Sequence, residues 1–143
     1  MLNRLARLKR RVSAKRRAGV HAPEVEAFLH VARQSFVKLQ AAWDAADLRA
    51  LSALTTESLL AELQDQLAAR GPGPNRTEVL QLDARLLGIE ELQEAFVASV
   101  EFSGLIRERL DDHGAAPFRE LWMLAKLKAA DRDWRLARVQ ALG

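Results

Sequence analysis

The chain has 143 residues, which suits a single domain, and its apolar content of 49% is enough for one hydrophobic core. It contains no cysteine, which excludes disulfide bonds and thiolate metal sites. Its apolar runs are only a few residues long, so we expect neither a membrane span nor a secretory signal. The net charge of +3 conceals an asymmetry, because residues 1–17 hold eight basic and no acidic side chains, whereas the rest holds 14 basic and 19 acidic ones.

Residues 1–18 are predicted to form a basic amphipathic helix. Four apolar side chains recur at helical spacing on one stripe: Leu2, Leu5, Leu8 and Val12. Most of the eight basic side chains fall on the opposite arc, and we expect all eight to contact anions: Arg4, Arg7, Lys9, Arg10, Arg11, Lys15, Arg16 and Arg17. This pattern is typical of helices that lie on an anionic membrane surface, where each basic group contributes on the order of 1 kcal/mol.

Two other roles of this basic arm stay open. Its leucine stripe would also pack on the body of the protein or on a protein partner. Nucleic acid is a further candidate, because phosphates attract the same charges. The arm has no aromatic side chain for base stacking, so nucleic acid is the least favoured partner.

Three more helices are predicted before any strand. The first spans about residues 24–46, the second residues 48–54, and the third ends at Arg70, before the run Gly71–Pro74. The predicted N-terminal caps are Asp47 for the second helix and either Thr55 or Thr56 for the third.

Beyond residue 76 the apolar period changes to two, which indicates strands. One face of the first strand is predicted to carry Leu80, Leu82, Ala84 and Leu86, and later strands are predicted around residues 96–103, 118–124 and 134–142. The predicted connections contain Gly88, residues 111–114 and residues 131–133. Short turns favour an antiparallel meander, and helices that precede strands indicate an α+β fold.

The order of these parts resembles the Tim44-like domain, which is the C-terminal domain of the membrane-anchoring subunit of the mitochondrial import motor and also occurs in bacterial proteins. The resemblance covers about residues 24–142. It rests on the segment FLHVARQSFVKLQAAWDAADLRALSALTTESLLAELQDQL, on the strand segments that follow, and on the positions of Trp43, Trp122 and Trp134. The Ala-, Arg- and Leu-rich composition is typical of a bacterial version.

The resemblance implies a nuclear-transport-factor-two-like fold, with helices packed on a strongly curved, cone-like antiparallel sheet of about four strands. This cone would occupy residues 21–143, behind an arm of residues 1–20. It implies a non-catalytic scaffolding role linked to protein transport, with lipid binding in an apolar pocket and no cofactor. It also implies peripheral association with an inner membrane, on the cytoplasmic side in a bacterium. The exposed sheet face is a candidate surface for a homodimer.

Aromatic side chains are the candidates for lining such a pocket, although filling the core is the simpler use of inward-facing rings. The candidate set is Phe28, Phe36, Trp43, Phe96, Phe102, Phe118, Trp122 and Trp134.

Catalysis is the less favoured interpretation. Glu120 is the only acid with the parity of the inward aromatics, so an isomerase- or dehydratase-like enzyme of this fold would use it as the general base. The plainer alternatives are that Glu120 pairs with an arginine or lies near the open end of the strand. The three histidines, His21, His30 and His113, show no metal-ligand spacing, and we expect no metal site. A ribosome- or RNA-associated role is the third interpretation, because a mitochondrial ribosomal protein shares this domain.

Overall fold

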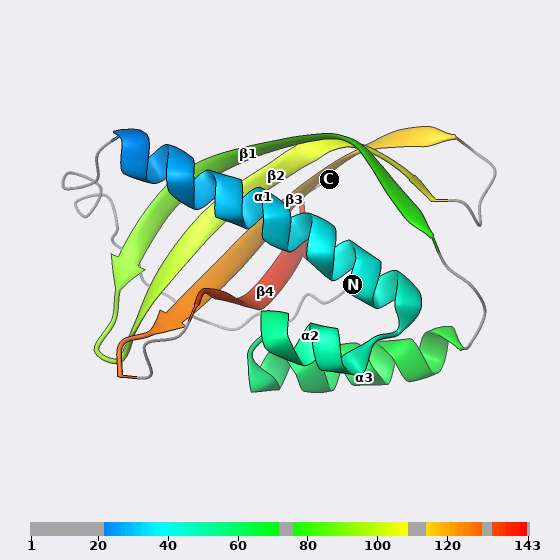
Figure 1. The fold of residues 1–143 in the computed structure, drawn as a ribbon, viewed down its shortest axis with the longest axis horizontal. Helices are drawn as coiled ribbons and strands as arrows, with labels where there is room; N and C mark the ends of the chain where they lie inside the picture. Colours follow the sequence, from blue (N-terminus) through cyan, green and yellow to red (C-terminus); the bar gives the residue numbers. More distant parts are fainter. Residues whose placement is uncertain (1–21, 72–75, 109–113, 130–132, 143) are drawn as a thin grey trace.

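A computed structural model describes residues 22–71, 76–108, 114–129 and 133–142 of the chain (Figure 1). Three helices precede four strands, as the sequence predicts. The elements are α1 (Ala22–Ala45), α2 (Leu48–Leu54), α3 (Glu57–Arg70), β1 (Thr77–Glu91), β2 (Ala95–Glu108), β3 (Ala115–Leu127) and β4 (Arg135–Ala141). The predicted basic helix lies outside the described residues.

The four strands form one antiparallel sheet in the order β1-β2-β3-β4, so the predicted meander is confirmed. The sheet is strongly curved, and α1 runs across its inner face (Figure 1). After α1 the chain turns back, and α2 and α3 lie below its C-terminal half in Figure 1, where α2 contacts α1 and both helices contact β4. The α+β class and the cone-like sheet that the resemblance implies are therefore present.

Side-chain caps set where the two shorter helices begin. Asp47 accepts a hydrogen bond from the backbone N–H of Ala50 at 3.1 Å, as predicted for α2. Of the two threonine candidates, Thr56 is the cap of α3, because its Oγ1 accepts from the N–H of Leu59 at 3.3 Å. These caps satisfy backbone donors that the helices cannot satisfy internally.

Thr55 has a different role and joins the helices to the sheet. Its side chain is 1% exposed, and its hydroxyl donates to the carbonyl of Leu51 at 2.8 Å. Its backbone forms an isolated bridge to Leu136 in β4, and the next N–H, of Thr56, donates to the Leu136 carbonyl at 2.9 Å. A buried hydroxyl is tolerated there because it is hydrogen-bonded.

Two β-bulges correct the prediction for the first strand. Leu80 and Leu87 are extra residues in β1, without a partner on β2. Each bulge shifts the alternation by one position, so Val79 packs against the core and Leu80, predicted to face inward, is 45% exposed. Gly88, predicted to lie in a connection, is paired inside β1, and the turn comes after Glu91.

The core is centred on Phe36 of α1, which is 1% exposed. Its ring lies 4.9 Å from the ring of Phe102, 5.4 Å from that of Phe118 and 5.0 Å from that of Trp122, measured between centroids. One helix side chain thus contacts aromatic rings on two neighbouring strands, and burying such a side chain contributes roughly 1.5–3 kcal/mol. This contact fixes α1 against the inner face of the sheet.

Candidate functional site

A cavity of about 360 Å³ lies between the C-terminal half of α1, the helices α2 and α3, and the sheet. On the sheet side its walls come from the first residue of β1, the last residues of β2 and the first half of β3. Its apolar lining consists of Phe36, Leu39, Trp43, Leu51, Leu63, Ile106 and Phe118. Its polar lining consists of Gln40, Gln66, Thr77, Glu108 and Glu120.

Three of the eight candidate pocket aromatics line this cavity, namely Phe36, Trp43 and Phe118. Two others, Phe102 and Trp122, are 0% and 1% exposed and pack behind Phe36 in the core. Strand alternation predicts that Phe102, Phe118 and Trp122 face inward, and Phe36 and Trp43 lie on the helix α1. Neither pattern shows which of these rings border empty space.

The remaining three candidates lie elsewhere. Phe28 and Trp134 pack edge to face, with ring centroids 5.2 Å apart, at the side of the core. Phe96 is at the start of β2, where the ammonium of Lys128 lies 5.0 Å from its ring centroid. These three rings are not part of the cavity lining.

Glu120 is the carboxyl group on the inner face of β3 at the cavity. Its Oε1 accepts a hydrogen bond from the indole Nε1–H of Trp122 at 2.9 Å. Burial raises the pKa of Glu120 above its ordinary value of 4.5, and the bond from Trp122 acts in the opposite direction. Within the described ranges no arginine bonds to Glu120, so the predicted arginine partner is replaced by a tryptophan.

The cavity offers few groups for chemistry. A single carboxyl group with a raised pKa meets one requirement of the enzyme interpretation. The part of the lining that the structure describes holds no histidine or lysine to act with it, and the chain has no cysteine. His30 is exposed on α1, and His21 and His113 lie outside the described residues. Among the residues that the structure describes, no three His, Asp or Glu side chains gather as metal ligands do. The arrangement is suited to holding a ligand.

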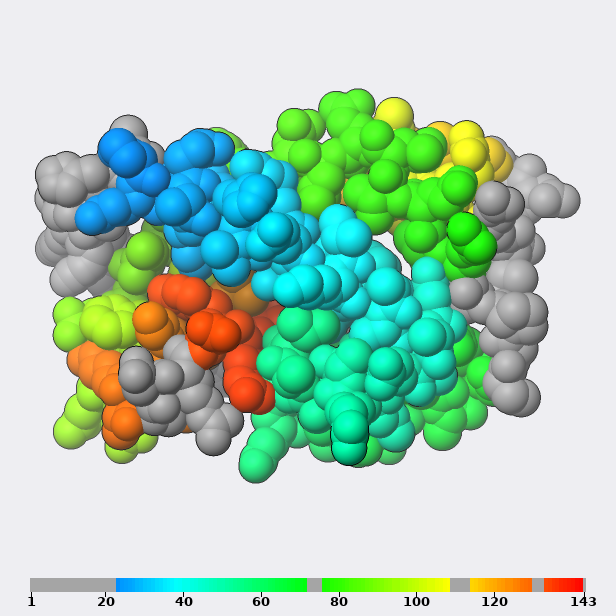
Figure 2. Space-filling view, in the orientation of Figure 1, coloured from blue at the N-terminus to red at the C-terminus, as the bar shows by residue number. Residues whose placement is uncertain are grey.

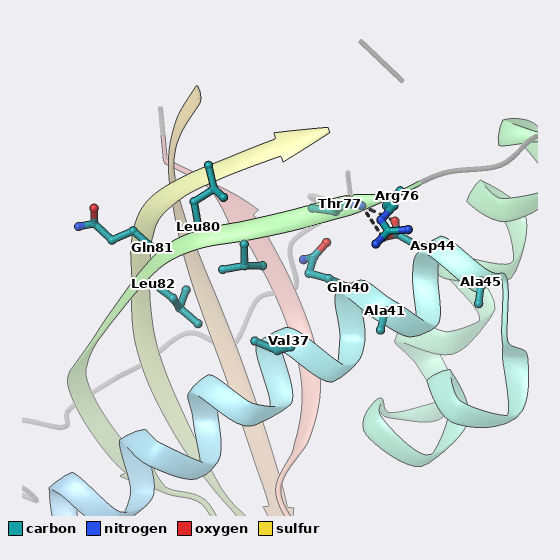
Figure 3. Close-up of a pocket in the computed structure, with 11 residues that line it drawn as sticks. Val37, Gln40, Ala41, Asp44, Ala45, Arg76, Thr77, Leu80, Gln81 and Leu82 are labelled. Carbon is teal, nitrogen blue, oxygen red and sulfur yellow. Dashed lines mark hydrogen bonds between the residues drawn. The ribbon is translucent and has the colours of Figure 1, made fainter. Parts of the chain in front are cut away.

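A second hollow, a surface groove of about 680 Å³, lies between α1 and β1 (Figure 3). These two elements are far apart in the sequence but adjacent on this side of the molecule (Figure 2). Val37 and Leu80 contribute exposed apolar surface to the groove. The sequence prediction missed it, because Leu80 reaches the groove only through the bulge.

The groove and the cavity meet at Gln40 and Thr77, which line both. The Thr77 backbone N–H donates to Oδ2 of Asp44 at 2.6 Å, and its hydroxyl donates to Oδ1 at 3.1 Å (Figure 3). These bonds fix the first residue of β1 to the last turn of α1. They therefore set the distance between α1 and the start of β1, where the groove meets the cavity.

On the outer face of the sheet, charged side chains of β1, β2 and β3 lie side by side. The carboxylate of Glu101 lies 2.6 Å from Arg85 and 3.0 Å from Arg119, and these two bonds hold its pKa below the ordinary value. Glu101 therefore pairs with arginines on both neighbouring strands, whereas Asp83 accepts a hydrogen bond from Gln81.

Three comparisons with known proteins complete the description. The chain is similar to a conserved protein from Planctomyces limnophilus DSM 3776 in its crystal structure, with 16% identity, a TM-score of 0.42, and coverage of 82% of this chain and 99% of that one. No curated protein matches the sequence. No helix in the described ranges is long and apolar enough to cross a bilayer. The family model of the Tim44-like domain matches residues 23–141, and the chain therefore belongs to the Tim44-like domain family.

Proposed function

We propose that this protein is a non-catalytic binding domain that works at a membrane surface and holds the apolar part of a ligand or partner in the cavity beside α1. The observation that carries the proposal is the cavity itself, which combines three aromatic rings with a few polar groups. The family is membrane-associated and generally not enzymatic, which supports the same role.

The size of the cavity limits what it can hold. A volume of about 360 Å³ lies near the lower end of the range for small-molecule sites, roughly 300–1,000 Å³. A chain of about six methylene groups buried there would contribute roughly 5 kcal/mol, before the cost of association is subtracted. We therefore expect weak and reversible binding of one short apolar segment.

Binding in the cavity can be tested with N-phenyl-1-naphthylamine, a neutral probe that becomes fluorescent in apolar surroundings. Gln66 lines the cavity from α3, so Gln66→Trp should fill part of it and lower probe binding. Gln64 is exposed on the same helix, and Gln64→Trp is the matched control. Fluorescence that is equal in both variants, or absent from the unmodified protein, would exclude the cavity as the binding site.

The proposed membrane association depends on the basic arm and needs its own test. Full-length protein and a variant lacking residues 1–18 are floated with cardiolipin-containing vesicles and with neutral vesicles. We expect only the full-length protein to float, only with the anionic vesicles, and less at high salt, because exposed charges are screened. Equal flotation of both proteins would remove the arm from the proposal, and a gel shift with RNA at moderate salt would test the nucleic acid alternative.

A further inference from the structure

We infer that the cavity selects an apolar ligand that carries a protonated amine, with Glu120 as the group that receives the ammonium. The inference rests on the proposed binding role and adds the chemical class of the ligand. Three observations support it: the charges of the lining, the hydrogen bonding of Glu120, and the aromatic walls.

The lining is acidic. Among the described residues, it contains two carboxylates, Glu108 and Glu120, and no lysine, arginine or histidine. Arg70 approaches Trp43 but is not part of the lining, and its Nη1 donates to the Trp43 carbonyl at 2.8 Å while its guanidinium lies 5.4 Å from the ring centroid. A ligand with an anionic head would therefore meet two like charges in the lining, whereas a cation would meet two opposite ones.

Glu120 has capacity for a further donor. Oε1 accepts from Trp122, and no donor in the described part of the chain bonds to Oε2. Phe118 and Trp122 flank Glu120 on the inner face of β3, and Phe102 is its partner on β2. A carboxylate among such side chains is poorly solvated, which raises its pKa, and an ammonium would supply both the missing hydrogen bond and the opposite charge.

The aromatic walls suit the same ligand. The rings of Phe36, Trp43 and Phe118 border the cavity and can contact either an alkyl chain or a cation through the ring face. A ligand with a hydroxyl in place of the ammonium would also bury apolar surface there and could donate to Oε2 of Glu120, but it would bring no opposite charge to the carboxylate. The lining therefore favours a cationic amphiphile over a neutral one of the same shape.

Three compounds with one apolar body test the inference: 4-phenylbutylamine, 4-phenylbutanol and 4-phenylbutyrate. The readout is the set of three indole N–H signals in ¹⁵N–¹H spectra of the full chain at neutral pH. We expect the amine to bind about tenfold more tightly than the alcohol and the carboxylate to bind most weakly. The signals of Trp43 and Trp122 should shift, whereas that of Trp134, which packs on Phe28, should not.

Two matched variants separate the role of Glu120 from a general effect of charge. Glu120→Gln keeps an oxygen that can accept from Trp122 but removes the charge, so the amine and the alcohol should bind equally. Asp83→Asn removes one acid from an exposed position in β1 and should keep the preference for the amine.

The outcomes distinguish this inference from the proposed function. If the alcohol binds the unmodified protein as tightly as the amine, the amine selectivity is refuted and the binding role stands. If none of the compounds shifts the indole signals of Trp43 and Trp122, both are refuted. Should Glu120→Gln fail to fold, the ratio of the amine and alcohol affinities in the unmodified protein still decides the question.

Discussion

Replacing Gly104 by alanine should disrupt the pairing of β1 and β2 next to the Leu80 bulge. Gly104 has φ +155°, a region that side chains with a Cβ rarely adopt, and it pairs with Leu82. A Cβ built at this position would lie 1.9 Å from the carbonyl oxygen of Gln81 and 2.7 Å from the carbonyl carbon. Because these are backbone atoms, no side-chain rotation can relieve the overlap, and the two strands must move apart.

The magnitude follows from two contributions. Holding alanine at this φ costs about 1–3 kcal/mol, and forcing extra volume into a packed contact costs about 1–3 kcal/mol. We therefore expect Gly104→Ala to lower the free energy of unfolding by about 2–6 kcal/mol, a large part of the roughly 5–15 kcal/mol typical of a domain. Separation of the strands would also weaken the bulge that turns Leu80 towards the groove.

Urea unfolding followed by circular dichroism measures this loss, and Gly71→Ala is the matched control. Gly71 caps α3 with φ +85°, but a Cβ there would meet no atom within 4 Å. Only the backbone conformation (φ +85°, ψ 174°) is penalised in this control, at a cost of about 1–3 kcal/mol. A loss of stability in Gly104→Ala no larger than that in Gly71→Ala would refute the steric argument.

Three further predictions concern single side chains, each measured by urea unfolding. The raised pKa of Glu120 means that its contribution to stability is present below its ordinary pKa of 4.5 and is lost as pH rises through the raised value. As pH rises from 4.5 through the raised pKa, Glu120→Gln should therefore gain stability relative to the unmodified protein, and a difference independent of pH would contradict this. Phe36→Ala should lower the free energy of unfolding by about 3–5 kcal/mol, because Phe36 is 1% exposed. A decrease below about 1 kcal/mol would mean that the core closes around the space left by the ring. Asp47→Ala removes the acceptor of the cap bond from Ala50 and should lower the free energy of unfolding by about 1 kcal/mol. Asp47→Asn can still accept that bond and should lower it much less.

The sequence by itself determined the elements whose signals are local. The bounds of α2 are those predicted, because an acceptor side chain directly before an apolar run defines where a helix begins. Phe102, predicted to face inward, is buried in the core. Its neighbour Glu101 lies on the outer face, because side chains alternate with a period of two along any strand without a bulge. The diffuse resemblance to the Tim44-like domain was likewise enough to identify the family.

The tertiary structure decided what depends on curvature and on contacts between distant segments. The bulge at Leu80 changes the register of β1 within a curved sheet, and no residue type in the sequence predicts it. The bonds from Thr77 to Asp44 join residues 33 positions apart and hold the first residue of β1 to α1. The cavity is the space that these long-range contacts leave open. The sequence therefore indicated which aromatic side chains face inward, but not which of them border the cavity. Phe36 lines it, whereas Phe102 is fully buried in the core.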